Sequence, residues 1–333
     1  MKARARIAAA AGTVALLTGT TVMLTGIAHA ASANQLAKTS QLAKTSASTA
    51  AGAPVVHIDG MVHYPSSDTP AQLARSFPET AFTATAGKSR YAYKGVALAT
   101  LASKAVPAYP KTLMNTTNPQ LRVTVTVTGA SGYQVTFALG ELLHNYGSHP
   151  AYLALTQDGR QISSGPELVV PGDKSPLRWM HRVRDVTIGI STLAATDNHP
   201  PAGGPVRVID GHRTVTLTSA QIASLPKETF HMSISAMHGM EKKTETGPSL
   251  LAVLKLADVK LSPDTWVTAV GYDNYTAVVT PEEQLVGDRK LQLSQVENGA
   301  RLAQPRLVPY GDSYADRFVF GVVDLYVGTG PVN

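Results

Sequence analysis

Apolar and polar residues alternate along residues 121–128, with leucine and valine at every second position and arginine or threonine between them. This period of two predicts a β-strand with one buried and one polar face. Residues 98–105 instead place leucine and alanine at helical spacing, and residues 250–257 repeat that pattern later in the chain. Strands and short helices therefore mix without the regular alternation of a doubly wound sheet, which favours the α+β class.

The two halves of the chain share motifs that indicate an internal duplication. Each half has a predicted capping box at the start of a short helix, Thr69–Gln72 and Thr218–Gln221. Residues 166–173 (PELVVPGD) align with residues 305–312 (PRLVPYGD) without a gap, and the same offset continues into the next predicted strand. We favour duplication over convergence of two similar domains, because one constant offset holds over many matched residue types.

The N-terminus has the three parts of a secretory signal peptide. Basic residues precede an apolar stretch, densest over residues 14–24, and Ala28-His29-Ala30 forms a small-residue cleavage site. We expect cleavage after Ala30 and export by the Sec route, since the basic region has no adjacent arginine pair. A retained membrane anchor is the alternative, but threonines and glycines interrupt the apolar stretch. We predict a secreted protein with no transmembrane segment after cleavage.

Residues 31–52 are rich in alanine, serine and threonine and contain a perfect direct repeat of the hexapeptide QLAKTS. This composition is typical of a flexible linker, which is the interpretation that we favour. The repeat also suits amide cross-linking between glutamine and lysine side chains, with the candidates Gln35, Lys38, Gln41 and Lys44.

Dense proline and glycine predict a second linker at residues 191–205. The chain thus divides into a signal peptide at 1–30, a linker at 31–52, a first unit at 53–190 (unit A), this second linker, and a second unit at 206–330 (unit B). Each unit is expected to contain mixed strands and short helices.

Composition and charge exclude several functions. The absence of cysteine excludes disulfides, thiol nucleophiles, iron–sulfur clusters and thiolate-held metals. Removal of the signal peptide with its three basic residues leaves 26 basic and 23 acidic residues, and no dense basic stretch suggests a nucleic-acid partner. Hydrolase, zinc-protease and P-loop motifs do not occur. Glu141, Asp158 and Asp185 are acids without an evident partner.

Unit A contains an ordered series of motifs. A Gly-Val-x-Leu helix is followed by the valine-rich strand, Gly132-Tyr133, Asp158-Gly159, the segment 165–173 and a closing strand at 179–188. In this order and spacing the chain resembles the oxidoreductase molybdopterin-binding domain family of the sulfite-oxidase type. The resemblance covers most of residues 53–190 and reaches unit B through the duplication. It implies two tandem α+β units of a fold that surrounds a molybdenum–pterin site in active members.

In active members of that family, a cysteine thiolate between a strand and the Gly-x-x-Leu helix holds the metal. The nearest positions here are Thr85 and Ser235, and neither residue can supply a thiolate. The resemblance therefore implies a retained fold in which molybdopterin is possible but molybdenum catalysis is lost. The missing arginine pair agrees, because such enzymes generally leave the cytoplasm folded and loaded by the twin-arginine route.

A cluster of imidazole and thioether side chains suggests another chemistry, because these ligands suit copper in an exported protein. Its members are His231, Met232, Met237, His238 and Met240. On a strand, Met232 and His238 would share one face while His231 and Met237 share the other, which divides the cluster. Methionines that pack in a core are the alternative interpretation, and we favour it.

Three arginines of unit A are candidates for an anion-binding or cofactor-binding site. Arg178, Arg182 and Arg184 follow the period of a strand, and three guanidinium groups on one face can bind phosphate or sulfate. Unit B retains only Arg317 at these positions, so the predicted site belongs to unit A. A solvated edge strand protected by its charges is the alternative, which we slightly favour.

We therefore predict an exported, non-catalytic binding or structural module whose partner is a small molecule, an envelope component or another protein, with no resident cofactor. One alternative is a molybdopterin-dependent oxidoreductase with an atypical, non-cysteine site. Another is an exported copper-binding protein. The sequence identifies neither the ligand nor the packing of the two units.

Overall fold

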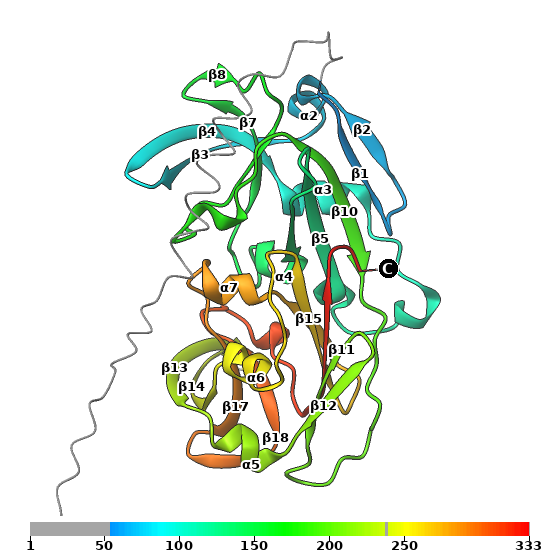
Figure 1. Cartoon of the computed structure of the whole chain (residues 1–333), viewed down its shortest axis with the longest axis vertical. Helices are drawn as coiled ribbons and strands as arrows, with labels where there is room; N and C mark the ends of the chain where they lie inside the picture. The colour runs from blue at the N-terminus through cyan, green and yellow to red at the C-terminus, as the bar shows by residue number, and fades with distance from the viewer. Residues whose placement is uncertain (1–53, 237–238, 333) are drawn as a thin grey trace, which may run out of the picture. The chain divides into compact units, whose positions relative to one another are not determined.

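Figure 1 shows the computed structural model, which describes residues 54–236 and 239–332. Most elements in these residues are strands, and the helices are few and short. The predicted mixture of strands and short helices is thereby confirmed. Several predictions fall outside the described residues: the signal peptide, the repeat with Gln35, Lys38, Gln41 and Lys44, and two copper candidates, Met237 and His238.

The first large sheet belongs to unit A and has the strand order β2-β1-β10-β5-β6. β1 runs parallel to β10, and the other neighbouring pairs are antiparallel. Its strands are β1 (Val56–Gly60), β2 (Ser66–Asp68), β5 (Val123–Gly129), β6 (Gln134–Ala138) and β10 (Val183–Ile190). The sheet therefore pairs the first strand of unit A with its last.

The second large sheet has the same arrangement in unit B, with the order β12-β11-β19-β15-β16. Again the first strand, β11, runs parallel to the last, β19, and the other pairs are antiparallel. The register shift in β10 between Val183 and Asp185 has its counterpart in β19 between Val322 and Asp324. The strands are β11 (Val206–Asp210), β12 (Arg213–Leu217), β15 (Thr265–Gly271), β16 (Thr276–Val279) and β19 (Val322–Thr329).

Each unit also has a smaller sheet that begins with a long hairpin. In unit A the order is β3-β4-β7-β8, and β9 pairs with β7; in unit B the order is β13-β14-β17-β18. The strands of unit A are β3 (Glu79–Ala86), β4 (Ser89–Ala97), β7 (Tyr152–Gln157), β8 (Arg160–Gln161) and β9 (Glu167–Val169). Those of unit B are β13 (Lys227–Ala236), β14 (Gly239–Pro248), β17 (Leu291–Glu297) and β18 (Ala300–Pro309).

Short α-helices connect the strands, and both predicted capping boxes are confirmed. The Thr69 hydroxyl oxygen accepts the backbone N–H of Gln72 at 3.3 Å, and the Gln72 side chain accepts that of Thr69 at 2.8 Å. The corresponding distances between Thr218 and Gln221 are 3.2 and 2.9 Å. The helices are α2 (Pro70–Ser76), α3 (Leu98–Ala105), α4 (Leu139–Leu142), α5 (Ser219–Ala223), α6 (Leu250–Leu256) and α7 (Pro281–Leu285).

The predicted polar face of β5 is wrong. The valines of this strand are buried as expected, but Thr124 and Thr126 on the other face are buried as well. The hydroxyl oxygen of Thr126 lies 2.9 Å from that of Thr136 on β6. Because β6 contacts β15 and β16 of the second large sheet, and Val332 lies against Gly189 next to Thr124, this face is covered by protein instead of solvent.

Apolar side chains form two large cores, one around each large sheet. The predicted helical stripe in residues 98–105 is buried in the first core. Leu121 belongs to unit A but packs in the core of unit B. In the described part of the chain, no helix combines the length and the hydropathy that a membrane crossing requires.

Two glycines at matching positions allow close packing of strands. A Cβ atom on Gly95 of β4 would lie 2.1 Å from the carbonyl oxygen of Leu153, and one on Gly247 of β14 would lie 2.3 Å from that of Leu293. No side chain fits at such distances, so both smaller sheets require glycine where the neighbouring backbone approaches.

Candidate functional site

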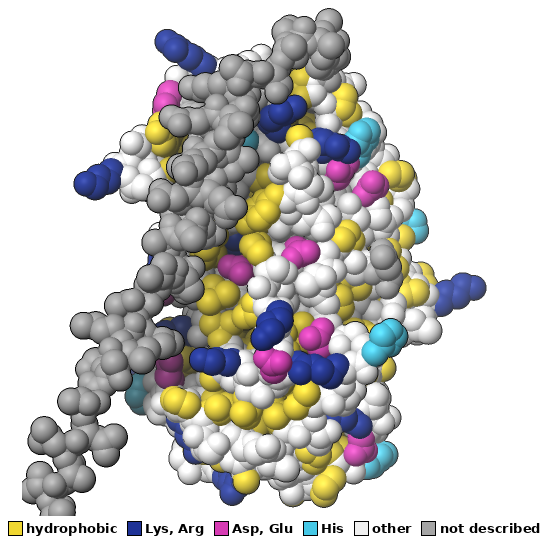
Figure 2. All heavy atoms as spheres, in the orientation of Figure 1, with side chains coloured by type: hydrophobic (Ala, Val, Ile, Leu, Met, Phe, Trp, Pro, Cys, Tyr) yellow, Lys and Arg dark blue, Asp and Glu magenta, His cyan; other side chains and the backbone are white. Residues whose placement is uncertain are grey.

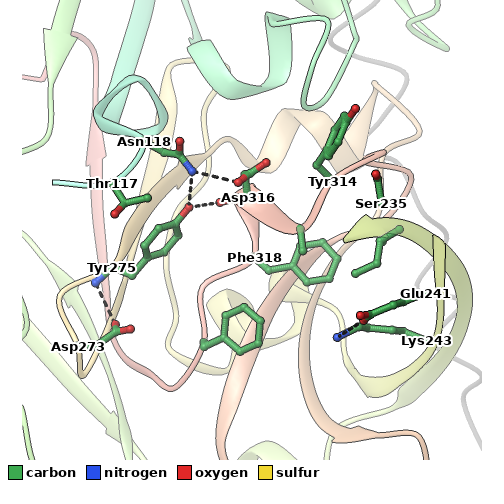
Figure 3. Close-up of a pocket in the computed structure, with 13 residues that line it drawn as sticks. Thr117, Asn118, Ser235, Glu241, Lys243, Asp273, Tyr275, Tyr314, Asp316 and Phe318 are labelled. Carbon is green, nitrogen blue, oxygen red and sulfur yellow. Dashed lines mark hydrogen bonds and ion pairs between the residues drawn. The ribbon is translucent and has the colours of Figure 1, made fainter. Parts of the chain in front are cut away.

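A cleft of about 650 Å³ opens beside the β13–β14 hairpin, and Figure 3 shows that its lining residues come from distant segments. Asn118 precedes the 3-10 turn η3 (Pro119–Arg122) of unit A, whereas Tyr275 lies between β15 and β16. Ser235 and Lys243 come from the hairpin, and another wall surrounds the 3-10 turn η5 (Ala315–Arg317). The volume falls within the range of small-molecule sites, about 300–1,000 Å³.

The hydroxyl group of Tyr275 joins two walls of this cleft (Figure 3). It donates to the backbone carbonyl of Asp316 and accepts a hydrogen bond from Nδ2 of Asn118 at 3.3 Å. The same nitrogen donates to Oδ1 of Asp316 at 3.1 Å. Burial raises the pKa of Tyr275, although the hydrogen bond from Asn118 opposes the rise, so the phenol stays protonated at neutral pH.

Ser235, the unit B position nearest the family's cysteine, lines the cleft. Its backbone N–H donates to the carbonyl of Ser313 at 2.9 Å, and it forms an isolated parallel bridge with Tyr314. Thr85, the corresponding position of unit A, is exposed on β3 opposite Arg90 of β4. Ser235 therefore contributes to a cavity, whereas Thr85 lies on an exposed hairpin.

Charged side chains are paired on the β14 side of the cleft. Nζ of Lys243 lies 3.0 Å from Glu297 and 3.6 Å from Glu241. Arg306 donates to Glu245 at 2.7 Å and to Glu297 at 2.8 Å. The hydrogen bond from Arg306 lowers the pKa of Glu297 to about 2; burial opposes this effect, and Lys243 adds to it. Both cations are thus already held by carboxylates.

The lining of the cleft does not fit the molybdenum–pterin group that the resemblance implies. Ser235, which the resemblance places nearest the family's cysteine, offers a hydroxyl and not a soft sulfur ligand. The carboxylates of Glu241, Asp273 and Asp316 outnumber the single lysine, and no described lining residue is an arginine. An oxyanion would therefore face negative charge without the guanidinium fork that binds such groups.

The copper candidates that the structure describes do not converge. His231 is exposed on β13, with Nδ1 3.1 Å from the hydroxyl oxygen of Thr244. Its neighbour Met232 packs against a small apolar cluster of unit B, while Met240 on β14 is 67% exposed. Among residues 54–236 and 239–332, no group of three histidine, cysteine or acidic residues is placed to hold a metal ion.

The prediction that Arg178, Arg182 and Arg184 share one face of a strand is wrong. Arg178 lies in the 3-10 turn η4 (Pro176–Arg178), Arg182 has a left-handed φ of 57°, and β10 begins only after it. The turn and the positive φ interrupt the extended backbone, so the period of two ends there. The side chain of Arg184 is 61% exposed, whereas that of Arg178 is fully buried.

Arg178 instead belongs to a buried ion network. It donates to Glu141 at 2.6 Å and to both carboxylate oxygens of Asp173, at 2.7 and 2.9 Å. The ring nitrogens of buried His149 lie 3.4 Å from Glu141 and 3.2 Å from Asp173. Burial raises the pKa of Glu141. Burial alone would also raise the pKa of Asp173, but hydrogen bonds from His149 and Arg178 lower it. Glu141, an acid without a partner in the sequence analysis, is therefore fully paired.

Unit B has a matching network around Arg317. This arginine donates to Glu283 at 2.5 Å, and its Nε lies 3.6 Å from Asp312. Arg289 also donates to Asp312, at 3.3 Å. Burial by itself would lower the pKa of Arg317, but Asp312 and Glu283 keep it above its ordinary value. Both units thus hold one arginine between a glutamate and an aspartate.

The two buried arginines reach the backbone of the opposite unit. A Cβ atom on Gly147 of unit A would lie 2.6 Å from a terminal nitrogen of Arg317. A Cβ atom on Gly287 of unit B would lie 2.9 Å from a terminal nitrogen of Arg178. These arginines therefore position the two units against each other, and their burial removes them from contact with an external anion.

Nothing in the sequence pattern marks Asn118 or Asp316 as a site residue, and Tyr275 is marked only weakly. One signal was present, because a tyrosine follows the same turn in both units. The hydroxyl of Tyr133 donates to the carbonyl of Leu177 at 2.7 Å, as that of Tyr275 does to Asp316. The shared tyrosine thus marks a shared hydrogen bond, but the cleft depends on segments that only the fold brings together.

Comparison with known proteins identified no family. No family model matches the chain, and no curated protein matches it. Among solved structures, the chain is similar to the sulfane dehydrogenase SoxCD from Paracoccus pantotrophus, with 16% identity and a TM-score of 0.32. The match covers 77% of this chain and 64% of the SoxCD chain. A likeness at this level carries no argument about function.

Proposed function

We propose that residues 53–190 and 206–330 are two tandem units of the molybdopterin-oxidoreductase-like fold, joined by residues 191–205. The large sheets support this proposal by their common strand order, their single parallel pair and their matching register shift. The paired glycines, tyrosine hydrogen bonds and buried arginines support it further. Two unrelated domains would have no physical reason to repeat all these features in the same order.

We further propose that the chain is a non-catalytic binding or structural module, with the cleft beside Ser235 as its ligand site. The observation that carries this proposal is the lining: Ser235, which the resemblance places nearest the family's cysteine, offers a hydroxyl, and three carboxylates line the same cleft. Such groups suit hydrogen bonds to a small molecule better than a soft metal or an oxyanion. A shared fold does not imply a shared activity, so the function must be inferred from the residues of the site.

The expected signal peptide at residues 1–30 would place this module outside the cell. Its partner there would be a small molecule, an envelope component or another protein, and the cleft favours the small molecule. The two alternatives, an atypical molybdopterin oxidoreductase and a copper-binding protein, both require a metal. Elemental analysis therefore separates them from the binding module.

We expect protein purified from its native host to contain only trace molybdenum and copper after extensive dialysis, as measured by inductively coupled plasma mass spectrometry. Near-stoichiometric molybdenum would contradict the proposal and favour the oxidoreductase. In that event, Ser235→Ala should lose the metal if Ser235 is its ligand, whereas Ser233→Ala, on the same strand and exposed, should retain it. Near-stoichiometric copper would favour the copper-binding alternative.

A further inference from the structure

Three carboxylates line the cleft: Glu241, Asp273 and Asp316, here called the outer carboxylates. Oδ1 of Asp273 accepts the backbone N–H of Tyr275 at 2.9 Å, and Oδ1 of Asp316 accepts Nδ2 of Asn118. Each of these bonds holds one oxygen of its carboxylate and fixes the group in place. Figure 3 shows the three groups on different walls of the same cleft.

The two neighbouring cations do not offset these charges, because carboxylates outnumber them. Lys243 lies 3.0 Å from Glu297 and 3.6 Å from Glu241, and Arg306 lies 2.7 and 2.8 Å from Glu245 and Glu297. The two cations thus face Glu245 and Glu297 in addition to the three outer carboxylates, which leaves an excess of negative charge. The outer carboxylates therefore set the sign of the potential in the cleft, and a cleft of one sign concentrates ligands of the opposite charge.

Aromatic rings add a second element of recognition. Tyr314 and Phe320 line the cleft and are each 43% exposed. The guanidinium carbon of Arg306 lies 4.0 Å from the centre of the Phe320 ring, so a ring of this cleft already binds one cation. Ring faces attract ammonium and guanidinium groups and also cover apolar parts of a ligand.

Because carboxylates and ring faces select the same ligand charge, we propose that this cleft binds a small organic cation. Its ammonium or guanidinium group meets the outer carboxylates, and its apolar body lies against Tyr314 and Phe320. This inference rests on the proposed binding function and names the ligand class. A neutral molecule of the same shape loses the charge interaction, and an anion is repelled.

Three probes of one shape test the charge requirement: phenethylamine, phenethyl alcohol and hydrocinnamate. By titration calorimetry of the full mature chain at low salt, we expect phenethylamine to bind about tenfold more tightly than the alcohol, since a cation–π contact and ion pairing contribute about 1–2 kcal/mol. Added sodium chloride should weaken this binding, because it screens the partly exposed carboxylates. Agmatine provides a guanidinium probe.

Binding of hydrocinnamate or the alcohol as tightly as phenethylamine would overturn the inference, as would no binding of either cation. Asp316→Asn and Asp273→Asn should weaken cation binding several-fold. Asp258→Asn is the matched control, because it removes the same charge from an exposed carboxylate outside the cleft. Equal loss in the control would also overturn the inference, since it would indicate non-specific attraction.

The two proposals fail in different ways. Stoichiometric molybdenum in the native protein contradicts the binding module itself. A metal-free protein that binds the anionic probe in this cleft contradicts the ligand class alone.

Discussion

At the scale of residues, Arg178 shows how burial decides the role of a charge. Its guanidinium is fully buried and holds Glu141 and Asp173. Removing one partner of a buried ion pair leaves the other charge uncompensated where water cannot solvate it. Arg184, six positions further along the chain, is 61% exposed and lies 4.0 Å from Asp185. Ion pairs of this exposed kind contribute little to stability.

We therefore expect Arg178→Ala to lower the free energy of unfolding by about 3–5 kcal/mol, because Glu141 remains buried without its cation. Arg184→Ala should change it by less than about 0.5 kcal/mol, as surface substitutions usually do. Urea denaturation followed by circular dichroism measures both. Similar losses of unfolding free energy in the two variants would contradict the assigned roles. So would a wild type that binds phosphate more tightly than the Arg184→Ala variant does.

Sequence separation explains which residue contacts could be predicted. Thr69 and Gln72 are three positions apart, so helical geometry alone brings them together. Glu141 and Arg178 are 37 positions apart, and Asn118 and Tyr275 are 157 apart. Only the fold determines these contacts. The sequence therefore predicted the capping boxes but neither the buried ion networks nor the cleft.

At the scale of elements, an ion cluster connects three strands of the smaller sheet of unit B. Arg306 of β18 holds Glu245 of β14 and Glu297 at the end of β17. The low pKa of Glu297 means that its ionised form is stabilised in the folded chain. Folding and ionisation of this carboxyl are therefore linked.

The linkage has a definite sign. Glu297 has a pKa that falls from 4.5 to about 2 on folding, so its contribution to stability is present above pH 4.5 and is lost as pH falls toward 2. We expect Glu297→Gln to have a lower melting temperature than the wild type at pH 7, with a difference that shrinks as pH falls. Differential scanning calorimetry from pH 7 to pH 2 measures this difference. A difference in melting temperature that stays constant across this pH range would contradict the lowered pKa of Glu297.

Two predictions from the hydrophobic pattern are wrong at the level of secondary-structure elements. The valine alternation located β5 correctly, yet its threonine face is covered by protein. A period of two predicts a strand but does not show whether its polar face is exposed. Threonine is small enough to pack between sheets when its hydroxyl is paired, as in Thr126 and Thr136. The prediction of a strand through Arg178 is wrong for another reason. The hydrophobic pattern does not indicate the 3-10 turn at Pro176 or the positive φ of Arg182.

At the scale of the whole molecule, residues 54–236 and 239–332 belong to one compact unit. Backbone hydrogen bonds join units A and B: Lys174 donates to the carbonyl of Val286 at 2.8 Å, and Thr136 donates to that of Pro263 at 3.1 Å. Figure 2 shows basic and acidic side chains close together on one face. The near balance of 26 basic and 23 acidic residues expected after signal removal agrees with this mixed surface.

Export is a prediction about the whole chain. We expect the mature protein in the culture medium to begin at Ala31, because the small residues Ala28 and Ala30 suit the signal peptidase. Intact-mass spectrometry and N-terminal sequencing identify the start. A full-length chain that sediments with membranes would contradict this prediction and favour a retained anchor.

The reach of Arg178 and Arg317 into opposite units has a consequence for the integrity of the chain. The segment 191–205 is mostly exposed, so a protease could cut there without breaking either ion network. The two fragments would remain associated, since each places a buried arginine against the backbone of the other. Either fragment alone would expose apolar surface and its own buried charged side chains to solvent. Completion of either ion network therefore requires both halves of the polypeptide.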